Sequence, residues 1–150
     1  MSSSDSTPEI PTLLEEFRAL AISEGLKKKS KIYKERRRQF LAEHVRDGFI
    51  DSFGVNASSL ENWKKLLATI GIDGYSDFTS IKQCKAALKG LYINLVDLVD
   101  AGRRGKVIDP PNPFPSQKAL ARYIRGTGKV FPKERAKANP LLRQFLIVVN

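Results

Sequence analysis

The stretch that decides the fold reads Ser58-Ser-Leu-Glu-Asn-Trp-Lys-Lys-Leu-Leu-Ala-Thr-Ile-Gly71. Ser58 and Glu61 have the spacing of a capping box, and Gly71 suits the position that follows a last helical turn. Between them, four apolar residues recur at helical intervals and share one face: Leu60, Trp63, Leu67 and Ile70. The stretch therefore predicts an amphipathic helix over 58–70 whose apolar face needs other helices to cover it.

Similar signals predict two helices before this one. Thr12 and Glu15 have capping-box spacing, and a helical apolar pattern follows them until Gly25. Ser30 is a suitable N-cap for a second, longer helix that Gly54 ends. The acidic first helix and the basic second helix are thus predicted to be neighbours in the chain.

A long fourth helix is predicted after the loop that follows Gly71. Ser80 is its expected N-cap, and its apolar stripe is unbroken over about five turns, as in a helix packed on a core. Gly90 lies inside this stripe, where glycine costs about 1 kcal/mol relative to alanine, and Gly102 ends the helix.

The C-terminal third has weaker signals. Residues 103–115 contain four prolines and are predicted to form an extended linker. Ser116 begins a fifth helix that ends at Gly126, and Pro132 suits the start of a short helical turn. Residues 141–149 are apolar and partly β-branched, so the pattern leaves helix and strand open there.

These elements predict an all-α fold, a compact bundle of five to six helices with a flexible N-terminal tail. We assign residues 1–11 to the tail and 12–150 to a single helical domain, since 150 residues is the usual size of one domain. The N-terminus has neither a signal peptide nor a myristoylation site, and no run is long enough to span a membrane. An intracellular protein, cytoplasmic or nuclear, is expected.

The net charge of +10 is concentrated in two segments. Residues 27–46 hold nine basic and two acidic residues, and residues 101–150 hold eleven basic and two acidic residues. Segregated basicity of this kind favours a directed electrostatic surface for an anionic partner. Basic residues at the start of the second helix also oppose its dipole, which suggests that something other than helix stability placed them there.

We therefore predict a non-enzymatic binding module for a polyanion, with nucleic acid as the favoured partner and Lys/Arg–phosphate contacts. The candidate binding residues are Lys27, Lys28, Lys29, Lys31, Lys34, Arg36, Arg38, Arg103, Arg104, Lys106, Lys118, Arg122, Arg125 and Lys129. Arg37 is expected to point towards the apolar face, where it must either extend its guanidinium to solvent or pair with an acid such as Asp97 or Asp100. The alternative is a helical protein-interaction module, with a homodimer as one form of it, whose basic faces meet an acidic protein.

Catalytic, metal and cofactor sites find little support in the sequence, and none is predicted. His44 is the only histidine and Cys84 the only cysteine, so a monomer cannot assemble a typical zinc site. Both are expected to be packed in the core. Asp97 and Asp100 share a helix face and are interpreted as surface charge.

Three stretches carry a resemblance to a known group of proteins. They are residues 31–38, the run Phe78-Thr-Ser-Ile-Lys-Gln-Cys-Lys-Ala-Ala-Leu-Lys89 with its continuation Asn94-Leu-Val-Asp-Leu-Val-Asp100, and Gly128-Lys-Val-Phe-Pro-Lys133. Together they resemble small basic uncharacterised proteins of filamentous fungi, over most of the chain beyond the tail. The resemblance implies a source for the protein and no chemistry.

Overall fold

The computed structural model describes residues 9–150, in which nine helical segments follow one another. They are α1 (Leu13–Ser23), α2 (Lys31–Phe53), α3 (Leu60–Ile70), the 3-10 helix η2 (Tyr75–Asp77), α4 (Ile81–Leu88), α5 (Leu95–Arg104), α6 (Gln117–Thr127), the 3-10 helix η3 (Lys133–Ala136) and α7 (Pro140–Val148). The predicted all-α class is confirmed, although seven α-helices replace the expected five to six. Most of the predicted flexible tail, residues 1–8, lies outside the described residues.

Side-chain caps decide where most of these helices begin. Four of the predicted N-caps form. In each, the side-chain oxygen accepts the backbone N–H of the residue three positions later: Thr12, Ser30, Ser80 and Ser116. The predicted cap of α3 is wrong by one residue, because Ser59 rather than Ser58 accepts the N–H of Asn62. Adjacent serines offer the same chemistry, so the pattern alone could not separate them.

The predicted long fourth helix is wrong, because it is two helices, α4 and α5. Gly90 adopts φ +83°, a left-handed conformation that interrupts the helix, and the side chain of Asn94 then caps α5 by accepting the N–H of Asp97. The apolar stripe crosses the break because Cys84 and Leu95 are buried in the same hydrophobic core.

Residues 141–149, for which the sequence pattern leaves helix and strand open, form a helix as far as Val148. Asn139 caps α7 and Pro140 occupies its first turn, so the apolar end of the chain is a helix. α5 runs to Arg104, which makes the linker begin two residues later than predicted, and α6 extends to a left-handed cap at Gly128 rather than ending at Gly126.

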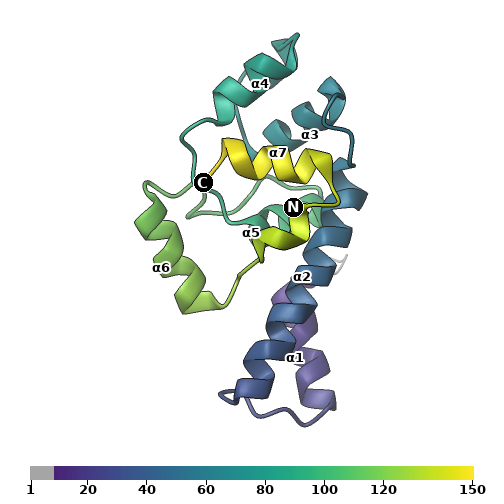
Figure 1. Cartoon of the computed structure of the whole chain (residues 1–150), viewed down its shortest axis with the longest axis vertical. Helices are drawn as coiled ribbons and strands as arrows, with labels where there is room; N and C mark the ends of the chain where they lie inside the picture. Colours follow the sequence, from purple (N-terminus) through teal and green to yellow (C-terminus); the bar gives the residue numbers. More distant parts are fainter. Residues whose placement is uncertain (1–8) are drawn as a thin grey trace, which may run out of the picture.

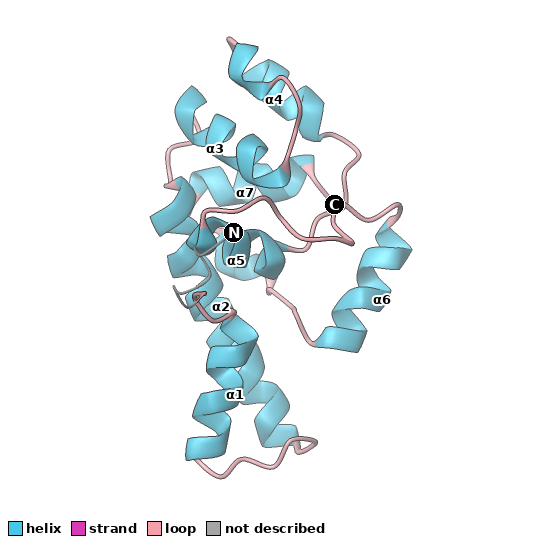
Figure 2. Cartoon of the chain, turned by 180° about the vertical axis from the view of Figure 1, so that it is seen from behind, coloured by secondary structure: helices cyan, strands magenta, loops and turns pink. Residues whose placement is uncertain are grey.

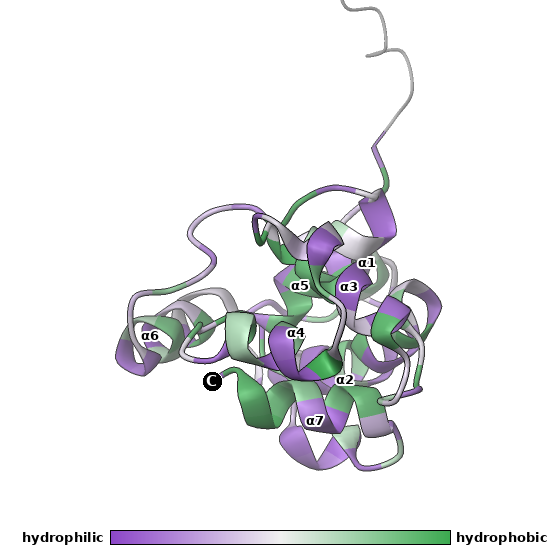
Figure 3. Ribbon diagram, turned by 90° about the horizontal axis from the view of Figure 1, so that it is seen from above, coloured by the Kyte–Doolittle hydropathy of each residue, from purple (hydrophilic) through white to green (hydrophobic). Residues whose placement is uncertain are grey.

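The hydrophobic core surrounds α5, which crosses the middle of the molecule (Figure 1). Its closest neighbour is α2: a Cβ added to Gly48 would lie 2.6 Å from Cγ1 of Val99, so the two backbones approach closely there. Trp63 of α3 and Phe145 of α7 close the core from the other sides. Figure 3 shows hydrophobic residues along α5, with α6 set apart from the other helices.

Two elements project from this body. The first half of α2 pairs with α1 as a helical hairpin that extends away from the core (Figures 1 and 2). This hairpin has a small hydrophobic cluster of its own, made of Phe17, Ala21 and Tyr33. The second projection is α6, in which Leu120 is the one buried residue.

Candidate functional site

Six of the fourteen predicted polyanion-binding residues are engaged in ion pairs within the protein. Arg36 pairs with Glu24 at 2.6 Å and Arg38 with Glu134 at 3.6 Å, both near the surface. Each of the other four is held by an acidic residue outside the two basic segments: Arg103, Arg104, Lys106 and Lys129.

The cations at the end of α5 hold the start of the described chain. Arg103 pairs with Glu16 of α1, and Lys106 pairs with Glu9. The guanidinium of Arg104 donates to the carbonyl of Ile10 at 2.9 Å and lies 3.6 Å from Glu9. These contacts fix residues 9–16 against α5, so these three cations have a structural role.

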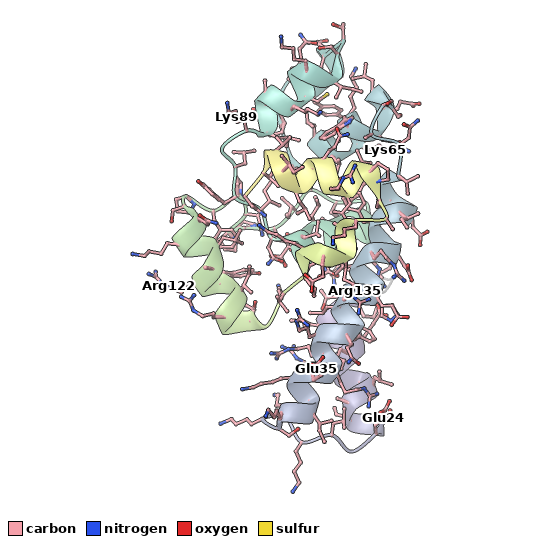
Figure 4. All side chains as sticks on the ribbon, in the orientation of Figure 1. Glu24, Glu35, Lys65, Lys89, Arg122 and Arg135 are labelled. Atoms are coloured by element: carbon pink, nitrogen blue, oxygen red, sulfur yellow. The ribbon has the colours of Figure 1, made fainter. Side chains whose placement is uncertain are left out.

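The remaining eight predicted cations are exposed, and none has a carboxylate within ion-pair distance in residues 9–150. Five lie at what we call the hairpin end, residues 20–34, which comprises the last turn of α1, the connecting loop and the start of α2: Lys27, Lys28, Lys29, Lys31 and Lys34. Three line one face of α6: Lys118, Arg122 and Arg125. Figure 4 shows Arg122 pointing away from the body of the protein.

The two basic segments meet through the ion pair of Arg38 with Glu134 and through Arg37. The guanidinium of Arg37 lies against Gly128, the C-cap of α6, and 5.9 Å from the centre of the Tyr33 ring. Of the two alternatives for Arg37, pairing with Asp97 or Asp100 is wrong, because those carboxylates pair with Lys129 and Arg103. In Figure 4, side chains ending in nitrogen extend from the start of α2 on the side where α6 lies.

Burial was predicted for both Cys84 and His44, and only the prediction for Cys84 is confirmed. Cys84 is buried as predicted, and burial raises the pKa of its thiol. His44 was predicted to be buried, but it is exposed, with its ring stacked on Phe40 at 4.1 Å between centres. The helical projection placed His44 beside Phe40 correctly; the hairpin leaves that side of α2 open because α1 covers only part of it.

The sequence interpretation missed a cavity of about 420 Å³ beside α5. We call it the α5 cavity, and its walls come from five separate parts of the chain: Glu9, Thr12, Asp97, Asp100, Ala101, Arg104, Lys106, Val107, Asp109, Pro110, Tyr123 and Lys129. Asp97 and Asp100, interpreted as surface charge, are largely buried in its wall, so that interpretation is wrong.

A hydrogen-bonded network centred on Asp97 forms one wall. Lys129 donates to Oδ1 at 2.7 Å, while the Tyr123 hydroxyl at 2.7 Å and the Asn112 amide at 2.9 Å donate to Oδ2. Burial opposes the charge on Lys129, but its hydrogen bonds to Asp97 and Tyr123 outweigh burial and raise its pKa. Burial also raises the pKa of Tyr123, and Asp97 adds to this effect. The network therefore joins the side chain of Asp97 to an ammonium and a neutral phenol.

Asp100 forms another part of the wall. Its Oδ1 accepts the backbone N–H of Leu13 at 3.0 Å, which ties the first turn of α1 to α5. Burial raises the pKa of Asp100 to about 6, and the nearby charge of Asp97 adds to the shift, against the opposing hydrogen bond and Arg103. A signal was present in the sequence, since both aspartates interrupt the apolar run 95–101 in which charged residues are unusual.

No family model, curated protein or solved structure matches the chain. Within residues 9–150, no helix combines the length and apolar character that a membrane span requires. The resemblance to fungal proteins stays a prediction. The surfaces that bear on function are the hairpin end and the exposed face of α6.

Proposed function

We propose that the protein binds a polyanion, with nucleic acid as the favoured ligand, through the hairpin end and the exposed face of α6. The observation that carries the proposal is the charge at the hairpin end. Residues 27–34 contain five exposed lysines and no acidic residue, and no carboxylate in residues 9–150 pairs with them. Unpaired, solvated cations release condensed counterions from phosphates on contact, which is the main source of non-specific affinity for nucleic acid.

The acidic residues of α1 could have neutralised this surface, and they do not. Glu16 pairs with Arg103, and Glu24, the C-cap of α1, pairs with Arg36, two residues after Lys34. The internal pairs therefore remove the cations of α5 from the binding surface and leave Lys118, Arg122 and Arg125 of α6 as its second part. A flexible ligand that follows both parts would pass the contact between Arg37 and Gly128.

A salt titration tests the proposal. We expect fluorescence anisotropy with a labelled 20-base-pair DNA duplex to show a log K that falls with log salt at a slope of about −7 if all eight cations contact phosphates, and proportionately less for fewer. A slope near zero between 50 and 200 mM salt, or no binding at 50 mM, would contradict the proposal.

Charge-reversal variants locate the surface. We expect the triple change Lys27→Glu, Lys28→Glu and Lys29→Glu to lower the affinity at least tenfold more than a control with equal charge change. The control is Lys65→Glu, Lys82→Glu and Lys89→Glu, three exposed residues on α3, on α4 and at its end. Lys65 and Lys89 lie far from the hairpin end (Figure 4). Equal losses in the two variants would show that net charge alone governs binding.

One observation favours a second candidate, an acidic protein partner or a second copy of this chain. Ile22 is 80% exposed in the last turn of α1, and Ile32 is 64% exposed in the first turn of α2, so both flank the lysines. Aliphatic side chains add little to a phosphate contact but contribute to protein interfaces. We expect Ile22→Ser with Ile32→Ser to leave DNA affinity unchanged; loss of a dimer in light scattering on the same change would favour this second candidate.

A further inference from the structure

The α5 cavity lies apart from the hairpin end and differs from it in charge. Four carboxylates and three basic side chains line it, in a protein whose net charge is +10. Its volume of about 420 Å³ falls in the range of small-molecule sites. Exposed residues such as Lys106, Val107 and Pro110 form part of the wall, so a ligand can reach it from solvent.

The three cations of the wall already have partners. Lys129 donates to Asp97 and to the Tyr123 hydroxyl, and Lys106 pairs with Glu9. Arg104 donates to the backbone carbonyl of Ile10 and lies near Glu9. An incoming anion would therefore have to displace existing carboxylates, which makes an anionic ligand a poor fit.

The acceptors of the wall are less completely used. The side chain of Asp100 is 9% exposed, and its Oδ2 receives no hydrogen bond from residues 9–150. No fully enclosed side-chain oxygen in the described chain lacks a partner, so Oδ2 is not fully enclosed, and Asp100 lines the cavity. Asp109 adds a carboxylate that pairs with no cation of residues 9–150.

These acceptors suit an organic cation better than a metal ion. In residues 9–150, no three His, Cys, Asp or Glu side chains converge closely enough to coordinate a metal. An ammonium group needs only one or two carboxylates and accepts further oxygen partners at hydrogen-bond distance. Ala101 and Val107 supply apolar wall for a short aliphatic chain.

We propose that the α5 cavity is a binding site for a small aliphatic amine, whose ammonium group donates to Oδ2 of Asp100 and is attracted by Asp109. The Asp97 network acts as the rigid wall of the site, because its hydrogen bonds fix Tyr123 and Lys129 in place. The site is separate from the polyanion-binding surface, since none of the eight exposed cations at the hairpin end and on α6 lines it.

Three probes of equal chain length test the charge preference: 1,4-diaminobutane, butane-1,4-diol and succinate. We expect isothermal titration calorimetry on the full chain to show saturable binding of the diamine, with a Kd at least tenfold lower than for the diol or succinate. No saturable binding of the diamine, or equal or tighter binding of the diol or succinate, would overturn the proposal.

Variants locate the binding. Asp100→Asn keeps the acceptor for Leu13 and is expected to fold, and we expect it to weaken the diamine at least tenfold. Asp73→Asn makes the same chemical change at an exposed position outside the cavity and should leave the Kd unchanged. Binding that survives Asp100→Asn, or that falls equally with Asp73→Asn, would overturn the assignment. DNA affinity of Asp100→Asn gives a separate readout, since the polyanion surface lies elsewhere.

Discussion

The Asp100→Asn substitution should stabilise the protein at neutral pH, although it removes a charged residue that forms a hydrogen bond. Burial raises the pKa of Asp100 from 3.8 to about 6 in the folded protein. The folded state therefore holds its proton over a pH range in which the unfolded chain has lost it, and the stability contributed by the neutral acid is lost as the pH rises through 6. Asparagine resembles the neutral acid and can still accept the N–H of Leu13 through Oδ1.

The size of the effect follows from the difference between the two pKa values. Raising a pKa from 3.8 to about 6 corresponds to about 3 kcal/mol of cost for holding the carboxylate ionised in the fold. We therefore expect the free energy of unfolding of Asp100→Asn to exceed that of the unsubstituted protein by up to about 3 kcal/mol at pH 7.5. At pH 4, just above the unfolded-state pKa of 3.8, the difference should shrink to roughly 0.5 kcal/mol, and it should vanish only well below that pKa, where the carboxyl is neutral in both states.

Urea denaturation followed by circular dichroism at pH 4, 5.5 and 7.5 measures this difference. Asp73→Asn is the control, because Asp73 is exposed and surface substitutions typically change stability by less than about 0.5 kcal/mol. Asp100→Asn would refute the reasoning if it were no more stable than the unsubstituted protein at pH 7.5. A gain of the same size at all three pH values would also refute it, because the cause would then not be the ionised carboxylate.

Two further pairs of substitutions test packing and capping by the same unfolding measurement. Gly48→Ala should destabilise the protein by roughly 1–3 kcal/mol, because its Cβ would lie 2.6 Å from Cγ1 of Val99. Gly126→Ala, a helical glycine with nothing within 4 Å of the added Cβ, should instead gain up to about 1 kcal/mol, and a loss there would contradict the reasoning. Ser59→Ala should lower the free energy of unfolding by about 1 kcal/mol, because α3 loses its N-cap, whereas Ser58→Ala should change it little. A larger loss for Ser58→Ala would show that Ser58 is the cap, as the sequence pattern predicts.

Local signals predicted the local features of the fold well. Ser30 and Gly54 bound α2 as expected, because an N-cap hydroxyl and a left-handed glycine act through the nearest few backbone groups. Gly90 is a position at which local signals do not determine the structure. A single glycine inside an apolar stripe is compatible with a continuous helix, and the break depends on α4 and α5 both packing on the same core.

The features that depend on distant contacts could not be predicted. Lys129 reaches Asp97 across 32 positions of sequence, and neither residue carries a local sign of the other. Arg37 was correctly expected to turn inward, but its neighbour, Gly128, comes from the C-cap of α6. The basic surface was predicted from composition, whereas its reduction from fourteen cations to eight required the ion pairs of the other six cations to be known.

The separate hydrophobic cluster of the hairpin has a consequence for how the molecule opens. Phe17, Ala21 and Tyr33 form a far smaller cluster than the one around Trp63, so less apolar burial opposes opening of the hairpin than of the body. The outer turns of α1 and α2 therefore form a cooperative unit that can unfold and refold while the body stays native. A partner that binds the lysines would slow amide exchange in this unit first, and the loop at 27–29 would be the first site cut by trypsin in the free protein.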